Sequence, residues 1–176
     1  APATLRYAAA LQVQGQEIAL DITRTVAADG DRFVIVDATE TPMGAAVDST
    51  VVAGADLRPV SRRVTQGPVR VAFDYAPDRV TGQIVAQGQT IPVDTALDAP
   101  LAIEGSSLYV GLGTLPLAPG FRAQFAGFDS QTQRAVSTTI EVTGTATVEV
   151  PAGTFETFVL SMTQGDGTGG GHGTLW

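Results

Sequence analysis

Residues 136–150 have the sequence VSTTIEVTGTATVEV and are followed at once by Pro151, Ala152, Gly153 and Thr154. Every even position in this run is apolar, small or threonine, whereas every odd position is polar. Period-two patterning of this kind, with one buried and one solvated face, is typical of a β-strand. The run therefore indicates a β protein, but it carries no signal for a particular activity.

The length of this run leaves two arrangements open. Fifteen residues at roughly 3.3 Å each extend for about 50 Å, so a single strand must bend, and Gly144 on the inward face is the natural kink. A two-residue hairpin at Thr143-Gly144 would turn Thr147 inward and Val148 outward, and is excluded for that reason. A three-residue loop from Thr143 to Thr145 preserves the pattern and stays open. We favour one long bent strand.

Length and composition bound the class of protein. A chain of 176 residues with 44% hydrophobic residues suits one domain with a substantial core, so we expect a single β-barrel-like domain over residues 1–176. The net charge of −8 disfavours nucleic acid and anionic membranes as partners. The lack of Cys excludes disulfides and thiol catalysis, and no apolar run reaches the roughly 18 residues of a transmembrane helix.

Period-two alternation recurs through the first 98 residues, where apolar runs and turn signals follow each other at intervals of about 8–12 residues. The turn signals are Gln14-Gly15-Gln16, residues 28–31 (ADGD), Gln66-Gly67-Pro68, Ala76-Pro77-Asp78 and Gln87-Gly88-Gln89. This spacing predicts an all-β, mainly antiparallel protein built as an up-and-down meander of eight or more strands. Because a twisted sheet of that size tends to curl, we expect an open or closed barrel.

The alternation breaks at residues 103–117. Leu108, Leu112 and Leu115 fall at helical spacing after Ser106 and Ser107, either of which could cap a helix. We therefore expect one short helix near residues 105–115, lying across one end or the open side of the sheet.

Arg62 is the first candidate binding residue. It shares its parity with Val60 and Val64, so it could face inward and clamp a carboxylate or phosphate head group. The alternative, which we favour, is an edge strand or a side chain that extends outward over apolar surface. Arg63 has the opposite parity and is expected to be solvated. The candidate contacts to a ligand or partner are Arg62, Tyr75, Tyr109 and Trp176.

A catalytic or metal site has little support in the sequence. His172 is the only histidine and lies with Asp166 in a glycine-rich run over residues 165–173. Together they could be metal ligands or part of a general-base site, but a flexible hairpin loop is the simpler interpretation, because one histidine does not make a typical transition-metal site. Asp94 and Asp98 lie on the polar parity of their strand, without the convergence that acid–base catalysis needs. We assign no catalytic, cofactor or metal residue.

Several short motifs occur in a characteristic order. They are residues 56–60 (DLRPV), which open a strand rich in Arg and Ser, then Phe73-Asp74-Tyr75, residues 115–120 (LPLAPG) and residues 148–157 (VEVPAGTFET). In this order, over roughly residues 56–176, the chain resembles exported bacterial proteins of a domain-of-unknown-function family, DUF3108.

The resemblance implies a periplasmic or outer-envelope β protein with an unclosed barrel like that of lipoprotein carriers. It supplies no catalytic residue. Such proteins usually continue past Leu175-Trp176, so we expect the last strands to be missing or disordered. Physically, Pro151-Ala152-Gly153 is a tight turn with Gly153 in the left-handed region, which fixes the register of the next strand.

These observations favour a non-enzymatic envelope protein that acts as a binding or assembly module. Its concave face would hold an apolar ligand, or a partner segment would add to an exposed strand edge. The second hypothesis is a carrier of lipid or another hydrophobic small molecule. The third is a hydrolase-like enzyme, which would need Asp166 and His172, or Arg62 and a carboxylate, to converge in a pocket. We expect no cofactor.

Overall fold

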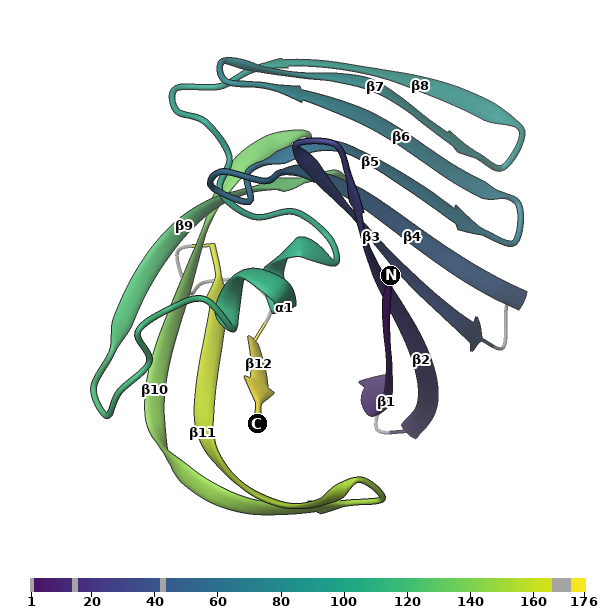
Figure 1. Ribbon diagram of the computed structural model, residues 1–176. Coiled ribbons are helices and arrows are strands. Elements are labelled where there is room, and N and C mark those ends of the chain that lie inside the picture. The colour runs from purple at the N-terminus through teal and green to yellow at the C-terminus, as the bar shows by residue number, and fades with distance from the viewer. Residues whose placement is uncertain (1, 14–15, 42–43, 166–171) are drawn as a thin grey trace. The chain divides into compact units, whose positions relative to one another are not determined.

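In the computed structural model, which describes residues 2–13, 16–41, 44–165 and 172–176, the chain is mostly antiparallel β-structure (Figure 1). It divides into two compact units, Ala1–Gly111 and Leu112–Trp176, and each unit contains its own sheet. The all-β class predicted from the sequence is confirmed. The expectation of one domain over residues 1–176 stays a prediction.

The first unit contains an eight-stranded antiparallel sheet in which each strand pairs with its neighbours in sequence. Its strands are β1 (Ala3–Val13), β2 (Gln16–Asp29), β3 (Arg32–Thr41), β4 (Gly44–Ala53), β5 (Pro59–Gln66), β6 (Val69–Ala76), β7 (Arg79–Ala86) and β8 (Gln89–Ala96). Two-residue turns join β2 to β3 and each consecutive pair from β5 to β8, where the sequence carries its turn signals. The predicted up-and-down meander is confirmed.

This sheet is open. Among the described strands, β1 pairs only with β2 and β8 pairs only with β7. Of the two forms expected from the sequence, the open one is therefore correct and the closed barrel is wrong.

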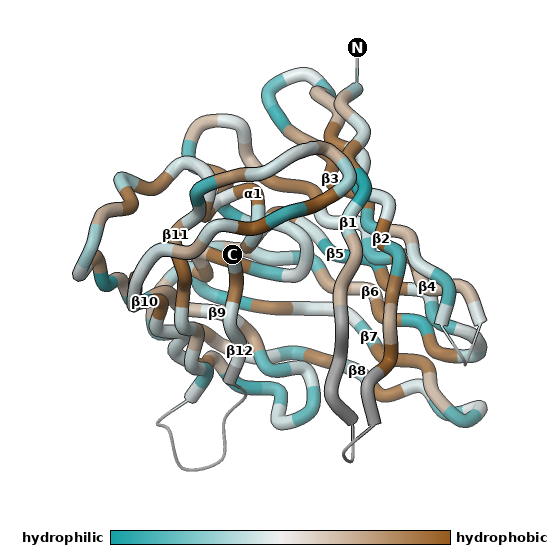
Figure 2. Tube along the Cα trace, turned by 90° about the horizontal axis from the view of Figure 1, so that it is seen from below, coloured by the Kyte–Doolittle hydropathy of each residue, from teal (hydrophilic) through white to brown (hydrophobic). Residues whose placement is uncertain are grey.

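One face of the eight-stranded sheet holds the core of the first unit, and we call it the inner face. Directly paired residues of antiparallel strands point to the same face, so the registers place Ile35, Phe73, Val80 and Val93 together. All four are at most 2% exposed. Figure 2, coloured by residue hydropathy, shows brown and pale segments following one another along the strands.

The predicted short helix is α1 (Ser107–Leu112), which follows β8 after a connecting segment. At its start the Ser107 hydroxyl accepts a hydrogen bond from the Glu104 amide at 3.0 Å and donates one to the Glu104 carbonyl at 2.6 Å. Both bonds run back to Glu104, before the helix, whereas the oxygen of a capping serine accepts from an amide two or three residues further on. The buried Ser106 hydroxyl has no hydrogen-bond partner among the described residues, so the helix is confirmed but the expected serine cap is wrong. Within the described residues, no helix has the length and hydropathy needed to cross a membrane.

The second unit contains a four-stranded antiparallel sheet in the order β12-β11-β10-β9. Its strands are β9 (Arg122–Asp129), β10 (Arg134–Val150), β11 (Gly153–Gln164) and β12 (His172–Leu175). Strand β10 runs unbroken for 17 residues, so the single long strand is confirmed and the three-residue loop is wrong. Its pairing with β11 shifts register between Val142 and Gly144, at the predicted kink.

The burial of β10 follows the predicted parity. Ile140 and Val142 are buried, whereas Glu141 and Thr143 are exposed. The strand ends in a two-residue turn that pairs Val150 with Gly153, whose φ of +137° confirms the predicted conformation of the turn after Pro151.

Candidate functional site

Four charged side chains form a row across the inner face of the first sheet. Asp37 on β3 is paired with Arg24 on β2 and with Asp48 on β4, whereas Arg62 on β5 is paired with Thr50, two residues along β4 from Asp48. These positions share one face because the residues are cross-strand partners or lie two apart on one strand. We call Arg24, Asp37, Asp48 and Arg62 the ionic row.

The two arginines of the ionic row offset the repulsion between its two aspartates. Asp37 and Asp48 face each other on neighbouring strands, and like charges placed directly opposite are destabilising. Arg24 binds Asp37 through Nε at 2.7 Å and Nη2 at 2.6 Å. Arg62 binds Asp48 through Nη2 at 2.7 Å and Nε at 3.1 Å. Each carboxylate is therefore held by a two-pronged, charge-assisted contact that offsets the repulsion.

The segment that precedes α1 is fastened to the ionic row at Glu104. The Glu104 side chain is only 4% exposed, and its Oε2 lies 3.5 Å from Nη1 of Arg62. The Tyr75 hydroxyl donates a hydrogen bond to the same oxygen at 3.3 Å. A buried carboxylate of this kind is tolerated because it has both a cation and a hydrogen-bond donor.

Gly105 allows this close fit. Its φ is +49°, and a Cβ atom at this position would lie 2.6 Å from Nε of Arg62 and 2.8 Å from Oγ1 of Thr50. A side chain would therefore meet both a strained backbone conformation and the ionic row itself. Residues 104 and 105 together set the backbone of the segment against β4 and β5.

The pKa values of Arg62 and Tyr75 are both raised above their ordinary values. Burial alone would lower the pKa of Arg62, but its hydrogen bonds to Asp48 and the charges of Asp48 and Glu104 outweigh burial and raise it. Burial raises the pKa of the Tyr75 hydroxyl, and the neighbouring Glu104 carboxylate raises it further. Both groups therefore keep their protons across the physiological range.

At the other end of the ionic row, the Arg24 guanidinium lies against two tyrosine rings. Its Cζ is 5.2 Å from the centre of the Tyr7 ring on β1 and 4.8 Å from the centre of the Tyr109 ring on α1, which are cation–π distances. Arg24 is 6% exposed, but Tyr7 and Tyr109 are 42% and 45% exposed, and Leu5 on the same face of β1 is 47% exposed. We call Leu5, Tyr7 and Tyr109 the apolar strip.

The structure brings three of the four candidate residues into this unit. Arg62 faces inward, as its parity allows, but the favoured alternative is wrong: β5 lies between β4 and β6, and the guanidinium binds carboxylates of its own chain. Tyr75 joins it through Glu104, and Tyr109 contacts Arg24.

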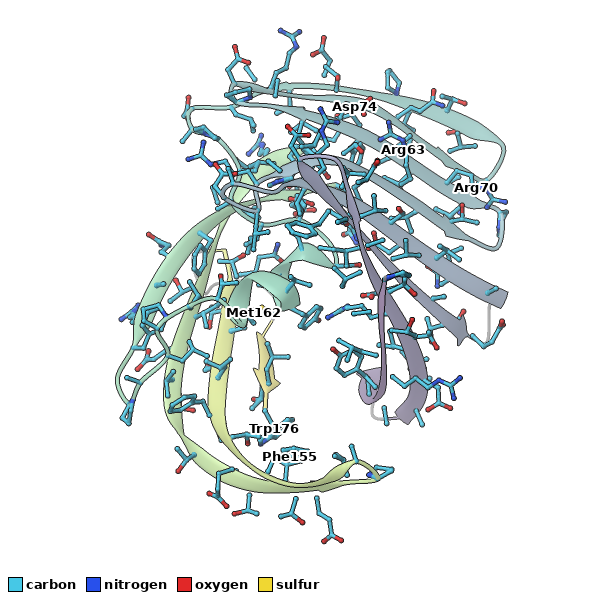
Figure 3. All side chains as sticks on the ribbon, viewed as in Figure 1. Arg63, Arg70, Asp74, Phe155, Met162 and Trp176 are labelled. Carbon is cyan, nitrogen blue, oxygen red and sulfur yellow. The ribbon has the colours of Figure 1, made fainter. Side chains whose placement is uncertain are left out.

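Trp176 belongs to the second unit, where it follows β12 and is 67% exposed. Figure 3 shows both Trp176 and Phe155 on the concave side of the four-stranded sheet. The expectation that Arg63 is solvated is confirmed, since its side chain is 48% exposed and reaches Asp74 at 2.6 Å (Figure 3).

The residues considered for catalysis do not form a described site. Asp166 lies outside the described residues, so the Asp166–His172 hypothesis and the glycine-rich loop cannot be placed, whereas His172 begins β12 opposite Thr163. Asp94 binds Arg79 with Nη2–Oδ2 at 2.6 Å. In the described part of the chain, the acidic and histidine side chains form no group of three that could hold a metal ion.

Sequence reasoning missed Arg24, Asp37, Asp48 and Glu104. A usable signal was present for Arg24, which lies between Ile22 and Val26 as Arg62 lies between Val60 and Val64. The same parity argument would have placed Arg24 on the inner face. The pairing of each arginine with an aspartate on the neighbouring strand required the register, which the sequence alone does not state.

The fold and the cluster define a class: an open antiparallel β-meander whose inner face is crossed by partly buried ion pairs. The chain matches the family model described as "Protein of unknown function (DUF3108)" over residues 4–176, and it therefore belongs to this family. The match extends the resemblance seen from residue 56 onward to nearly the whole chain. No curated protein and no solved structure matched the chain.

Proposed function

We propose that the chain is a non-enzymatic binding or assembly module of the bacterial cell envelope, exported to the periplasm or the outer envelope. It receives its partner on the apolar strip of the first unit. The observation that supports this proposal is the contrast within one face: the charged groups bind one another, whereas Leu5, Tyr7 and Tyr109 are almost half exposed.

The raised pKa values of Arg62 and Tyr75 favour a binding role over proton transfer. A general acid or base works best with a pKa near the operating pH, but the pKa values of Arg62 and Tyr75 are both raised above values that are already alkaline. Tyrosine, by contrast, is enriched at binding hot spots because its ring buries a large area with little loss of entropy. Arg24 holds Tyr7 and Tyr109 in place, which reduces that loss further.

A lipid or another hydrophobic small molecule is the second candidate occupant. The exposure of Leu5 beside Tyr7 favours it, because both side chains present apolar surface that an acyl chain could cover. The two candidates differ in what the protein would carry when purified gently from cells that export it.

Native mass spectrometry of that material tests the proposal. A polypeptide bound at fixed stoichiometry supports assembly, and bound lipid supports a carrier. The occupant should be lost in Leu5→Ser combined with Tyr7→Ser, and kept in the control Ile91→Ser. Ile91 is 42% exposed on the same face but lies on β8, at the opposite edge. An occupant that survives the double substitution, or no occupant at all, would contradict the proposal.

A further inference from the structure

The two edges of the eight-stranded sheet differ in their protection. Edge strands expose unpaired backbone N–H and C=O groups, and proteins protect them with proline and charge. Strand β8 carries Pro92, which has no N–H, and Asp94, which is held by Arg79. Strand β1 is eleven residues long, contains no proline, and carries a single charged residue, Arg6. The edge at β1 is therefore the one that another strand can join.

The side chains of β1 indicate which strand would fit. Leu5 and Tyr7 alternate on the inner face and are almost half exposed. Arg6, between them, points to the opposite face, is exposed, and makes no ion pair with the described residues. In a chain with a net charge of −8, an unpaired arginine on an open edge attracts a negative charge from outside.

From these observations we infer that β1 accepts an extended segment of another protein as an additional strand. The segment has apolar residues at alternate positions, which cover Leu5 and Tyr7, and an acidic residue beside Arg6. Backbone hydrogen bonds supply the affinity in this mode, and the alternating side chains supply the specificity. The inference rests on the proposed binding function and names the partner and the edge that it uses.

A second copy of the chain fits this edge less well. The β1 strand of a second copy offers no acidic residue to Arg6, and each copy brings the same net charge of −8. Self-pairing through β1 would therefore leave both arginines uncompensated.

Designed peptides test the inference on the intact chain. The probe is a capped eight-residue peptide of alternating valine and threonine with one central glutamate, and the matched peptide has lysine in place of glutamate. Fluorescence anisotropy should show tighter binding of the glutamate peptide. Hydrogen exchange should then show new protection at alternate amides of β1 and none at β8.

Charge reversal provides the second arm. Arg6→Glu should weaken the glutamate peptide by about threefold to tenfold and strengthen the lysine peptide, as expected for a cross-strand ion pair. The control is Arg122→Glu, which makes the same change at an exposed arginine on the edge strand β9 of the second unit. The control should bind both peptides as the unmodified chain does.

Several results would overturn the inference: protection at β8 or in the second unit instead of β1, equal effects of Arg6→Glu and Arg122→Glu, or a concentration-dependent dimer that protects β1 without peptide. Failure to bind either peptide would overturn it as well. If an occupant is lost in the Leu5→Ser, Tyr7→Ser variant while the peptides leave β1 unprotected, the binding function stands and the strand-addition inference falls.

Discussion

The inner face of the first sheet and the inward face of β10 in the second unit are built on the same period but carry different residues. Thr138, Ile140 and Val142 on β10 are buried without any charge, and no ion pair is described in the second unit. The first sheet places Arg24 and Arg62 at the equivalent inward positions. The comparison shows that period two assigns a face reliably, but a charged residue on that face is stable only if the neighbouring strand supplies its partner.

The largest effect should come from breaking the ionic row at one end. Arg62→Met leaves Asp48 and the buried Glu104 without their cation, and leaving a buried charge without its partner costs about 3 kcal/mol or more in the free energy of unfolding. Urea denaturation followed by circular dichroism measures the loss. On β10, the matched core truncation Ile140→Val should cost only about 1 kcal/mol. Arg62→Met combined with Asp48→Leu and Glu104→Leu should recover stability, and a triple variant no more stable than Arg62→Met would contradict the role given to the ion pairs.

The next effect should come from Gly105→Ala. The new Cβ would collide with Arg62 and Thr50 in a backbone conformation that costs a non-glycine residue energy, so we expect a loss of about 1–3 kcal/mol. Thermal unfolding measures it. Gly111 is helical, and apart from its chain neighbours and its own helix backbone nothing lies within 4 Å of a Cβ at this position, so stability should stay the same or rise in Gly111→Ala. Equal behaviour of the two variants would show that the segment is not fitted against the ionic row.

A smaller effect is expected at the tyrosine end. Tyr109→Ala removes one ring from Arg24, and an exposed cation–π contact contributes about 0.5–1 kcal/mol. Tyr109→Phe keeps the ring and should keep most of that stability in the same urea experiment. If both variants lose equally, the phenolic hydroxyl and not the ring face would be responsible.

The smallest effect concerns acid and a carboxylate of the second unit, Asp129. Burial alone would raise the pKa of Asp129 in the second unit, but hydrogen bonds from Gln131 and Thr132 lower it overall from 3.8. A lowered carboxyl pKa adds stability that is fully present above the unfolded value and is lost as the pH falls through the folded value. Stability measured by urea titration between about pH 5 and pH 2 should therefore fall less steeply in Asp129→Asn. An unchanged slope would refute this contribution.

Some of these features can be predicted from the sequence and others cannot. The β10 strand, its kink near Gly144 and the turn after Val150 follow from local pattern and turn chemistry, because each depends on residues close together in the chain. The ionic row depends on registers between four strands, and Glu104 reaches Arg62 across 42 positions. A parity argument can place Arg24 and Arg62 on a face, but it cannot pair them with Asp37 and Asp48.

The candidate residues show the same limit. The parity of Arg62 allows it to face inward, but the interpretation favoured from the sequence is an edge strand or an outward side chain. The structure places the guanidinium inward, as a partner of internal carboxylates and not as a free clamp for a ligand. The exposure of Tyr7 and Tyr109 could not be predicted from composition, since aromatic residues in a strand or helix are equally compatible with a core.

The meander topology of the first unit also has a kinetic consequence. Every strand from β1 to β8 pairs with the strand next to it in the chain, and most of the connections are two-residue turns. Loop closure at each step is therefore cheap in entropy, and the mean sequence separation of contacts stays low for an all-β protein. We expect such a sheet to form one hairpin after another. Its folding rate should exceed that of a β-sandwich of the same size, whose strands pair with strands far away in the sequence.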